Sequence, residues 1–240
     1  MRLSPVFAPE IFALRPDFAA LCLLAQGSGN GPSNAESDRL LAEAVAEFDA
    51  KPWAEGHVAA WRGAYRSFGA KPKRTPCSLE ALLKRARRDG QIRPVNAAVD
   101  LYNAISLRYA IPVGGEDAER IVGHPTLRRA TGPEPFETMA EGSPKTLYTD
   151  PGEVIWCDDA GVTCRRWNWR QGTRTQIRED SSAMWFVLER LEPMPLDALP
   201  EACAELVAGL RLVAGNAKFT ARLFHRENPD GEEIALPLPA

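Results

Sequence analysis

The sequence predicts an α+β fold, in which helices pack against a sheet of several strands. Some segments place apolar residues at helical spacing, whereas others are short apolar runs bounded by turn residues, as strands are. Two strand segments, 153–157 and 162–167, flank the turn sequence Asp158-Asp159-Ala160-Gly161. This arrangement predicts an antiparallel hairpin, and the neighbouring runs are expected to extend it into a sheet.

Five segments have the apolar spacing of helices. Ser78 is the expected N-cap of the third, and Gly69 ends the second. Trp61, Tyr65 and Phe68 follow one another at helical spacing in the second helix, and we interpret this aromatic stripe as core. The expected helices are 35–48, 57–68, 79–88, 94–109 and 196–212.

The other apolar runs predict strands. Residues 18–25 indicate a buried strand, although a short helix has a similar pattern. Residues 111–117 are rich in Pro and Gly and are expected to form a turn, and 131–151 a long loop. The tail from Asn228 onward combines prolines with acidic residues and is expected to be disordered. The further expected strands are 126–130, 153–157, 162–167, 173–178 and 183–190.

The domain organisation follows from this order of elements. With 240 residues, 45% of them hydrophobic, the chain is long enough for one sizeable core. We expect a main domain over 53–192, preceded by an N-terminal extension, 1–52, that packs a strand and a helix on it. Residues 193–240 are expected to add a C-terminal helix and a flexible tail.

Composition and missing motifs exclude several classes of protein. The net charge of -3 argues against a generic polyanion binder, so any nucleic-acid contact has to come from a local patch. No apolar run reaches the length of about eighteen residues that a membrane span needs, and the start lacks the features of a signal peptide. We therefore expect a cytoplasmic protein. The sequence has neither a phosphate-binding GxxxxGK[ST] loop nor a GxSxG elbow.

The cysteines predict neither a disulfide scaffold nor a structural zinc site. They are odd in number, lack the CxxC spacing, and accompany only three histidines. Cys157 and Cys164 flank the hairpin turn and could face each other, but two buried thiols are the simpler interpretation in a reducing compartment. The five are Cys22, Cys77, Cys157, Cys164 and Cys203.

The segment 94–109 combines a buried helix with a narrow polar stripe. Asn96, Asp100 and Asn103, spaced i, i+4, i+7, fall within about 60° of arc on the helix, and apolar residues cover most of the rest. Burying an acid between two amides is costly unless each finds a partner. The stripe either caps neighbouring loops or faces a ligand, and the Pro/Gly-rich segment that follows favours the ligand.

Two basic stretches are candidates for phosphate contacts. Lys71, Lys73 and Arg74 occupy a proline-flanked loop, and the basic end of the helix 79–88 follows them; a solvated face is the simpler interpretation. In the segment 165–170, arginine alternates with tryptophan, and strand geometry would place Arg165, Trp167 and Trp169 on one face. Guanidinium groups suit phosphates and indoles suit rings, but a cation-π ladder on an exposed face has the same pattern. The remaining residues of this segment are Arg166, Asn168 and Arg170.

These stretches resemble the B3/B4 tRNA-editing domain of the phenylalanyl-tRNA synthetase beta subunit, and more closely its free-standing bacterial relatives. The resemblance covers about Trp53 to Glu189. It rests on the two polar stretches together with the motifs Trp61-Arg62-x-x-Tyr65-x-x-Phe68-Gly69, Ser78-Leu79-Glu80-Ala81-Leu82, Pro112-x-Gly114-Gly115-x-Asp117 and Gly152-Glu153-Val154. It implies an α+β editing fold with a mixed or antiparallel sheet.

The resemblance also implies a site and a reaction. The reaction is hydrolysis of the ester that links a wrong amino acid to the terminal ribose of a tRNA, with no metal and no cofactor. Asn96 and Asn103 would orient the water or the carbonyl, and Asp100 would bind the α-ammonium. The implied pocket consists of Tyr102, Pro112, Gly114, Gly115, Trp167, Asn168 and Trp169, and the implied tRNA contacts are Lys71, Lys73, Arg74, Arg165, Arg166 and Arg170.

The sequence departs from the synthetase at three points. Tyr102 replaces the synthetase threonine, Gly114 replaces its histidine, and no glutamate lies within 167–177 to recognise the hydroxyl of a misattached tyrosine. The synthetase specificity is therefore not transferred to this chain. The losses favour an alternative, a binding module for an amino acid or tRNA that has kept the fold without the reaction.

A third hypothesis is that the basic patches dock a protein or ribosomal partner. We expect aminoacylated tRNA as the partner, with neither membrane nor DNA binding. The sequence leaves open the oligomeric state, the amino acid and the tRNA.

Overall fold

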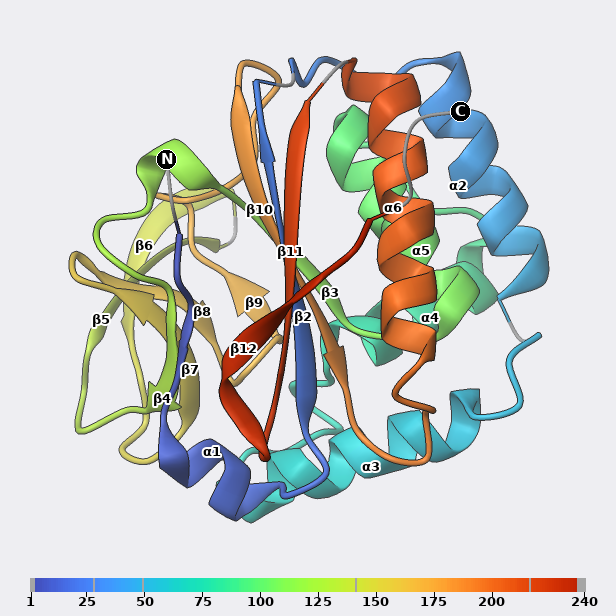
Figure 1. Cartoon of the computed structure of the whole chain (residues 1–240). Coiled ribbons are helices and arrows are strands. Elements are labelled where there is room, and N and C mark those ends of the chain that lie inside the picture. Colours follow the sequence, from blue (N-terminus) through green and yellow to red (C-terminus); the bar gives the residue numbers. More distant parts are fainter. Residues whose placement is uncertain (1–2, 28, 49, 141, 216, 237–240) are drawn as a thin grey trace.

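The computed structural model describes residues 3–27, 29–48, 50–140, 142–215 and 217–236. Within these residues the chain forms two five-stranded sheets, a separate two-stranded hairpin, and helices that pack around the second sheet (Figure 1). The first sheet has the order β1-β4-β7-β8-β9 and the second β12-β11-β2-β10-β3.

The strands pair almost entirely in antiparallel fashion. Among the described pairs only β1 and β4 are parallel. The predicted α+β class with mixed or antiparallel sheets is confirmed. The strands are β1 (Val6–Phe7), β2 (Ala19–Gln26), β3 (Val113–Asp117), β4 (Thr126–Arg129), β5 (Pro135–Ala140), β6 (Ser143–Tyr148), β7 (Val154–Asp158), β8 (Gly161–Arg165), β9 (Arg170–Gln171), β10 (Ala183–Arg190), β11 (Lys218–His225) and β12 (Asn228–Ile234).

The helices pack around the second sheet. Helices α5 and α6 cover one of its faces, with α2 packed on α5, while α1, α3 and α4 contribute to the core on the other face (Figure 1). All five predicted helices are confirmed, with ends shifted by a few residues. The helices are α1 (Pro9–Leu14), α2 (Ala35–Glu47), α3 (Ala54–Ser67), α4 (Ser78–Asp89), α5 (Ala97–Tyr109) and α6 (Ala198–Ala214), and a 3-10 turn, η1 (Ala118–Arg120), follows β3.

The central strands are apolar along their whole length because both faces of the second sheet are covered. In β2, Leu21 and Leu23 contact the core under α5 and α6, whereas Cys22 and Leu24 contact the core shared with the first sheet. The aromatic stripe of α3 belongs to the core shared with the first sheet, as predicted, and Trp61 is fully buried there. One strand therefore joins the two cores.

Four local predictions are wrong. Residues 113–117 form the edge strand β3 instead of a turn, because β10 supplies the partners of its backbone. The expected loop before residue 151 contains the β5–β6 hairpin, which is held by the fully buried Phe136. In contrast, 173–178 forms no strand beyond an isolated bridge between Glu116 and Gln176. Ser78 is the first residue of α4, and Cys77 is its cap.

The C-terminal tail is also more ordered than predicted. Residues 228–234 form β12, which pairs with β11 at the edge of the second sheet, so the expected disorder is wrong there. The last four residues of the predicted tail lie outside the described residues. The division at 52 and 193 stays a prediction, and both flanking segments contribute strands to the second sheet.

Candidate functional site

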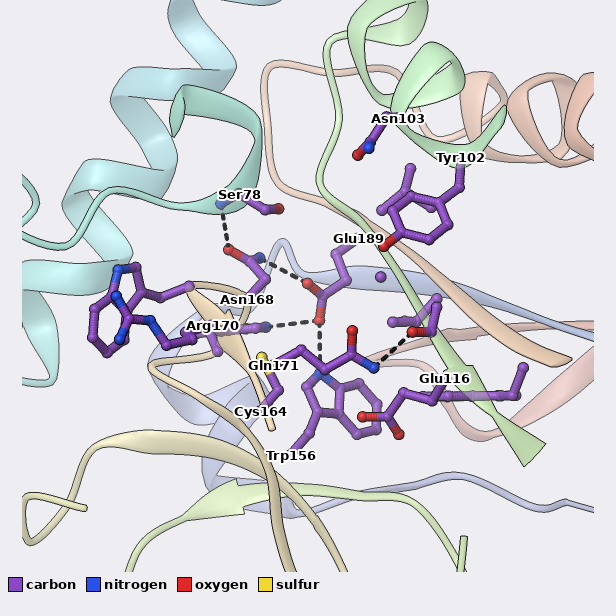
Figure 2. A pocket seen from close by; sticks show the side chains of 17 residues that line it. Ser78, Tyr102, Asn103, Glu116, Trp156, Cys164, Asn168, Arg170, Gln171 and Glu189 are labelled. Atoms are coloured by element: carbon purple, nitrogen blue, oxygen red, sulfur yellow. Dashed lines mark hydrogen bonds between the residues drawn. The ribbon is translucent and has the colours of Figure 1, made fainter. Parts of the chain in front are cut away.

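A small pocket lies between the two sheets, where the edge strands β3 and β9 approach each other (Figure 2). Its cavity has a volume of about 160 Å³. Side chains from α4, α5, both sheets and the turn before β9 line it. The lining residues are Ser78, Tyr102, Asn103, Val113, Gly114, Gly115, Glu116, Trp156, Cys164, Trp167, Asn168, Trp169, Arg170, Gln171, Trp185, Val187 and Glu189.

The register of β3 against β10 places two carboxyl groups in this pocket. Glu116 lies opposite Trp185 in the ladder, and the next inward positions of β10 are Val187 and Glu189. Because alternate residues of a strand share a face, all of these side chains point toward the first sheet. Gln171 closes the space between the sheets, since its Nε2 donates to the Gly115 carbonyl at 2.7 Å.

Glu189 is surrounded by uncharged donors. Trp156 Nε1 and Trp167 Nε1 donate to its Oε1 at 3.2 and 3.1 Å, and Asn168 Nδ2 donates to its Oε2 at 2.7 Å (Figure 2). Burial raises the pKa of Glu189 to about 7, although these three hydrogen bonds favour the ionised form. Indole and amide groups therefore fix the carboxyl in place, and none of its hydrogen-bond donors among the described residues is a cation.

Glu116 is less well satisfied. Thr175 Oγ1 donates to its Oε1 at 3.2 Å, whereas Oε2 is buried without a hydrogen-bond partner among the described residues. Burial raises the pKa of Glu116 to about 7, more than the nearby threonine hydroxyls lower it. A buried acceptor without a donor costs free energy, so a ligand that donates a hydrogen bond there would gain it.

Gly115 lets neighbouring side chains pack directly on the backbone of β3. A methyl group at this position would lie within 3.0 Å of the side chains of Ile177, Phe186 and Tyr102. Tyr102 packs edge-on against Phe186, and burial raises the pKa of its hydroxyl well above the usual value. Burial likewise keeps the pKa of the Cys164 thiol high, so this thiol stays protonated at neutral pH.

The polar stripe of α5 is divided between two environments. Asn96 caps the helix, with Oδ1 accepting from Val99 N at 3.1 Å and from Asn30 Nδ2 at 3.0 Å. Asp100 accepts from the Ser33 hydroxyl and, at 2.7 Å, from Val95 N. Neither of these two stripe residues lines the pocket.

The catalytic roles that the sequence suggested for Asn96 and Asp100 therefore lose their geometric basis. Asn103 is the member of the stripe that faces the pocket. Its amide has no hydrogen-bond partner among the described side chains, and Figure 2 shows it beside Tyr102 at the α5 end.

The segment 165–170, which alternates arginine and tryptophan, forms a turn beside the pocket instead of the expected strand. Strand β8 ends at Arg165, and Arg166 and Trp167 have φ values of 48° and 68°. The predicted alternation of faces is therefore wrong beyond Arg165. The turn brings Trp167, Asn168 and Trp169 together against the pocket, with Tyr65 donating to Asn168 Oδ1 at 2.8 Å.

Comparison with known proteins identifies the family. A family model described as the B3/4 domain matches residues 60–197, more than half of the chain. The chain belongs to the B3/4 domain family. Seventy-one of its residues are 37% identical to the phenylalanine–tRNA ligase beta subunit of Mycoplasma genitalium, covering 30% of this chain and 8% of that protein.

A second relative is also a phenylalanine–tRNA ligase beta subunit that matches over a short stretch. The beta subunit of Corynebacterium efficiens is 30% identical over 95 residues, which cover 39% of this chain and 11% of that protein. The B3/4 chain thus spans only a small part of these relatives' lengths. An N-terminal fragment of the phenylalanyl-tRNA synthetase beta subunit from Pyrococcus horikoshii aligns with 99% of this chain and 55% of its own, at 12% identity and a TM-score of 0.49.

The other predicted pocket and tRNA residues of this B3/4 domain are scattered. Gly114 lines the pocket, but Pro112 does not; its carbonyl accepts from Glu189 N at 3.0 Å. Arg165 is buried in a two-point ion pair with Glu153, so it is not available to a phosphate. Arg170 lines the pocket. Three other predicted cations line a second cavity: Lys71, Arg74 and Arg166. Lys73 lines neither of these two cavities.

Sequence reasoning missed Glu116 and Glu189. The search for an acid was confined to 167–177, while the structure supplies acids from β3 and β10. An acidic residue near the end of the otherwise apolar run 183–190 was the available signal, because such a residue is costly to bury.

Two further classes of site are not seen. The described residues contain no cluster of three or more His, Cys, Asp or Glu side chains placed to hold a metal ion. None of the helices described in the structure is both long and apolar enough to cross a membrane.

Proposed function

We propose that this B3/4 domain hydrolyses the ester between a mismatched amino acid and the terminal ribose of a tRNA, acting apart from a synthetase. The family and the names of its relatives support a tRNA-related role. The observation that carries the proposal is a small pocket with buried carboxyls inside and with half-buried polar, aromatic and cationic residues at its rim, among them Asn103, Trp169 and Arg170.

The size of the cavity limits what can enter it. A volume of about 160 Å³ is close to that of an engineered cavity that holds one benzene molecule. One amino-acid side chain fits such a space, whereas a nucleotide does not. The ribose and the rest of the tRNA would therefore stay outside, against the rim.

The residues in the pocket suit ester hydrolysis by a positioned water. This chemistry needs hydrogen-bond donors for the developing oxyanion and an acceptor near the aminoacyl group. The Asn103 amide, which has no partner among the described side chains, can donate to the carbonyl, and Glu116 Oε2 is a buried acceptor that no described residue satisfies. The protonated Cys164 takes no part as a nucleophile.

The test is a deacylation screen with total tRNA charged by each amino acid in turn. Purified protein is expected to release at least one amino acid, and Asn103→Ala and Glu116→Gln are expected to slow that release about tenfold or more. Asn96→Ala is the matched control, because it removes an amide of the same helix that does not line the pocket. Inactivity against the complete panel would contradict the proposal.

A binding module without catalysis is the second candidate. It is favoured by Tyr102 and Gly114 at the positions of the synthetase threonine and histidine, and by the lack of histidine among the lining residues. This alternative predicts saturable binding of an amino acid or an aminoacyl ester without turnover. Calorimetry with the amino acids and their non-hydrolysable esters separates the two.

A further inference from the structure

A second cavity lies on the other side of the turn that forms one wall of the pocket. It has a volume of about 440 Å³ and opens to solvent. Arg166 lines this cavity while the next three residues line the pocket, so a single turn separates the two spaces. The lining residues are Phe68, Gly69, Ala70, Lys71, Arg74, Thr75, Asp150, Pro151, Glu153 and Arg166.

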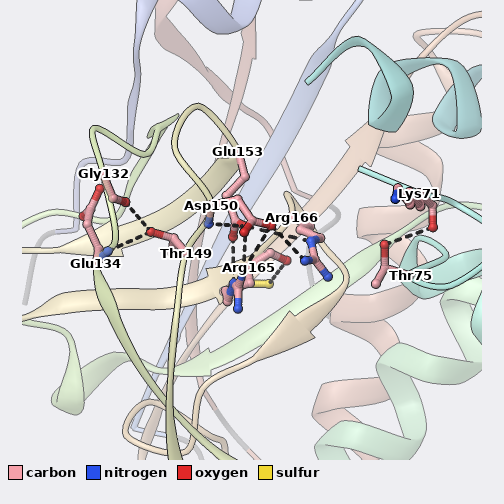
Figure 3. A network of polar contacts seen from close by, with 10 residues as sticks. Lys71, Thr75, Gly132, Glu134, Thr149, Asp150, Glu153, Arg165 and Arg166 are labelled. Atoms are coloured by element: carbon pink, nitrogen blue, oxygen red, sulfur yellow. Dashed lines mark hydrogen bonds and ion pairs between the residues drawn. The ribbon is translucent and has the colours of Figure 1, made fainter. Parts of the chain in front are cut away.

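The acids of this second cavity are already paired. Arg165 donates to both oxygens of the buried Glu153 at 2.8 and 2.7 Å, and Arg166 contacts Asp150 at 3.1 Å (Figure 3). These contacts neutralise both carboxylates locally. The charge that the cavity presents to a ligand is then set by its remaining cations.

Two of those cations have no counter-ion. Neither Lys71 nor Arg74 forms an ion pair with any described residue, and both side chains are exposed. Their loop is nevertheless well held, because the backbone N–H groups of Arg74 and Thr75 both donate to the Lys71 carbonyl, at 2.8 and 2.9 Å. The Thr75 hydroxyl donates to the same oxygen at 3.2 Å (Figure 3). Two unpaired positive charges therefore stand at fixed backbone positions.

Trp169 joins this cavity to the pocket. The guanidinium of Arg166, which lines the cavity, lies 4.6 Å from the centre of the Trp169 ring, and that of Arg170, which lines the pocket, lies 4.5 Å from it. Such cation-π contacts hold both guanidinium groups near one ring. A chain molecule that leaves the pocket past Trp169 would thus meet a continuous cationic path.

We infer that this second cavity binds backbone phosphates of the single-stranded 3′ end of the tRNA whose aminoacyl group enters the pocket. The inference rests on the proposed function and adds to it the site that recognises the nucleic-acid part of the substrate. Arginine forks and lysine ammonium groups are the usual phosphate ligands, and a single strand can bend around a turn between two sites. The small pocket then selects the amino acid, and the larger cavity selects the RNA.

The experiment compares two double variants of equal charge. Lys71→Ala/Arg74→Ala removes the unpaired cations of the cavity, and Lys218→Ala/Arg93→Ala removes one exposed lysine and one exposed arginine that line neither space. Binding of uncharged tRNA is measured by fluorescence anisotropy at several salt concentrations. Hydrolysis is measured with aminoacyl-tRNA and with an aminoacyl ester of adenosine, which has no phosphate.

The first double variant is expected to bind tRNA about tenfold or more weakly, and to lower the salt slope by about 1.4 for two lost phosphate contacts. Its hydrolysis of the adenosine ester should equal that of the wild type, and the control pair should bind tRNA almost normally. Equal losses in both pairs, or equal binding of an acidic peptide, would overturn the inference. If tRNA binding depends on Lys71 and Arg74 but no ester is hydrolysed, the proposed function fails while the phosphate site stands.

Discussion

Asp100 at the start of α5 and Glu116 on β3 are both buried carboxyls, but they differ in how many of their oxygens accept a hydrogen bond from the protein. Both oxygens of Asp100 accept hydrogen bonds from the protein, one from the Ser33 hydroxyl and one from Val95 N. Glu116 keeps one buried oxygen without a hydrogen-bond partner in the part of the chain that the structure describes, and it lines a cavity. The first carboxyl holds the local main chain, whereas the second keeps an oxygen that no described group of the protein satisfies.

This difference shows what a buried polar residue says about function. Burial raises the pKa of both acids, so a raised pKa does not separate them. The separating property is whether the protein itself supplies every hydrogen bond that the group needs. In α5 the same rule divides one stripe, since Asn96 is satisfied by the chain and Asn103 is not.

The largest stability effect is expected for Glu116→Gln. The pKa of Glu116 is about 7 in the folded protein against 4.5 ordinarily, so the folded state binds more protons between these values and its stability falls as pH rises from about 4.5 to 7. A neutral side chain removes that loss and should raise the free energy of unfolding by about 3 kcal/mol at pH 8, with little change at pH 4.5. Urea unfolding at both pH values measures this. An equal change at both would contradict the assignment.

Asp100→Ala should have the next largest effect, in the opposite direction. It leaves the Val95 N–H and the Ser33 hydroxyl without their acceptor, which should lower the free energy of unfolding by about 2 kcal/mol. Deacylation per folded molecule should not change, because this carboxylate lies outside the pocket. A variant that is fully stable but inactive would return Asp100 to the active site.

Asn96→Ala tests the same side of the comparison with a smaller change. The variant loses the N-cap of α5 and the contacts to Asn30 and Ile177, and stability should fall by about 1 kcal/mol. Thermal unfolding followed by circular dichroism gives the size of the loss. Asn96→Asp, which can still accept from Val99 N, should recover part of it.

Asn103→Ala should have the smallest effect on stability and a clear effect on function. Since the amide has no partner among the described side chains, the free energy of unfolding should change by less than about 0.5 kcal/mol. The rate of deacylation should nevertheless fall about tenfold or more. A rate equal to that of the wild type, measured on the tRNA that the screen identifies, would remove Asn103 from the site.

The sequence predicted the helices better than the strands. Helices such as α2 and α5 carry their own apolar spacing and caps, whereas β3 contains two glycines and two acids and becomes a strand only because β10 pairs with it. The same holds for β12, because its acidic sequence does not predict a strand and only its pairing with β11 makes it one. Strand pairing depends on a distant partner, and one sequence segment does not contain that information.

The sequence by itself determined most of the scaffold: apolar periodicity predicts the helices, and the continuous apolar runs indicate buried strands at β2 and β10, although for β2 a short helix has a similar pattern. The resemblance to the B3/B4 editing domain placed Tyr102, Asn103 and the segment 167–169 in one site, and all of these residues line the pocket. Only the tertiary structure decided which polar groups are free, because a hydrogen-bond partner such as Ser33 or Asn30 lies more than sixty residues away along the chain. Whether a buried carboxyl is satisfied is a property of its neighbours in space, and for that reason Glu116 and Glu189 emerged only from the folded chain.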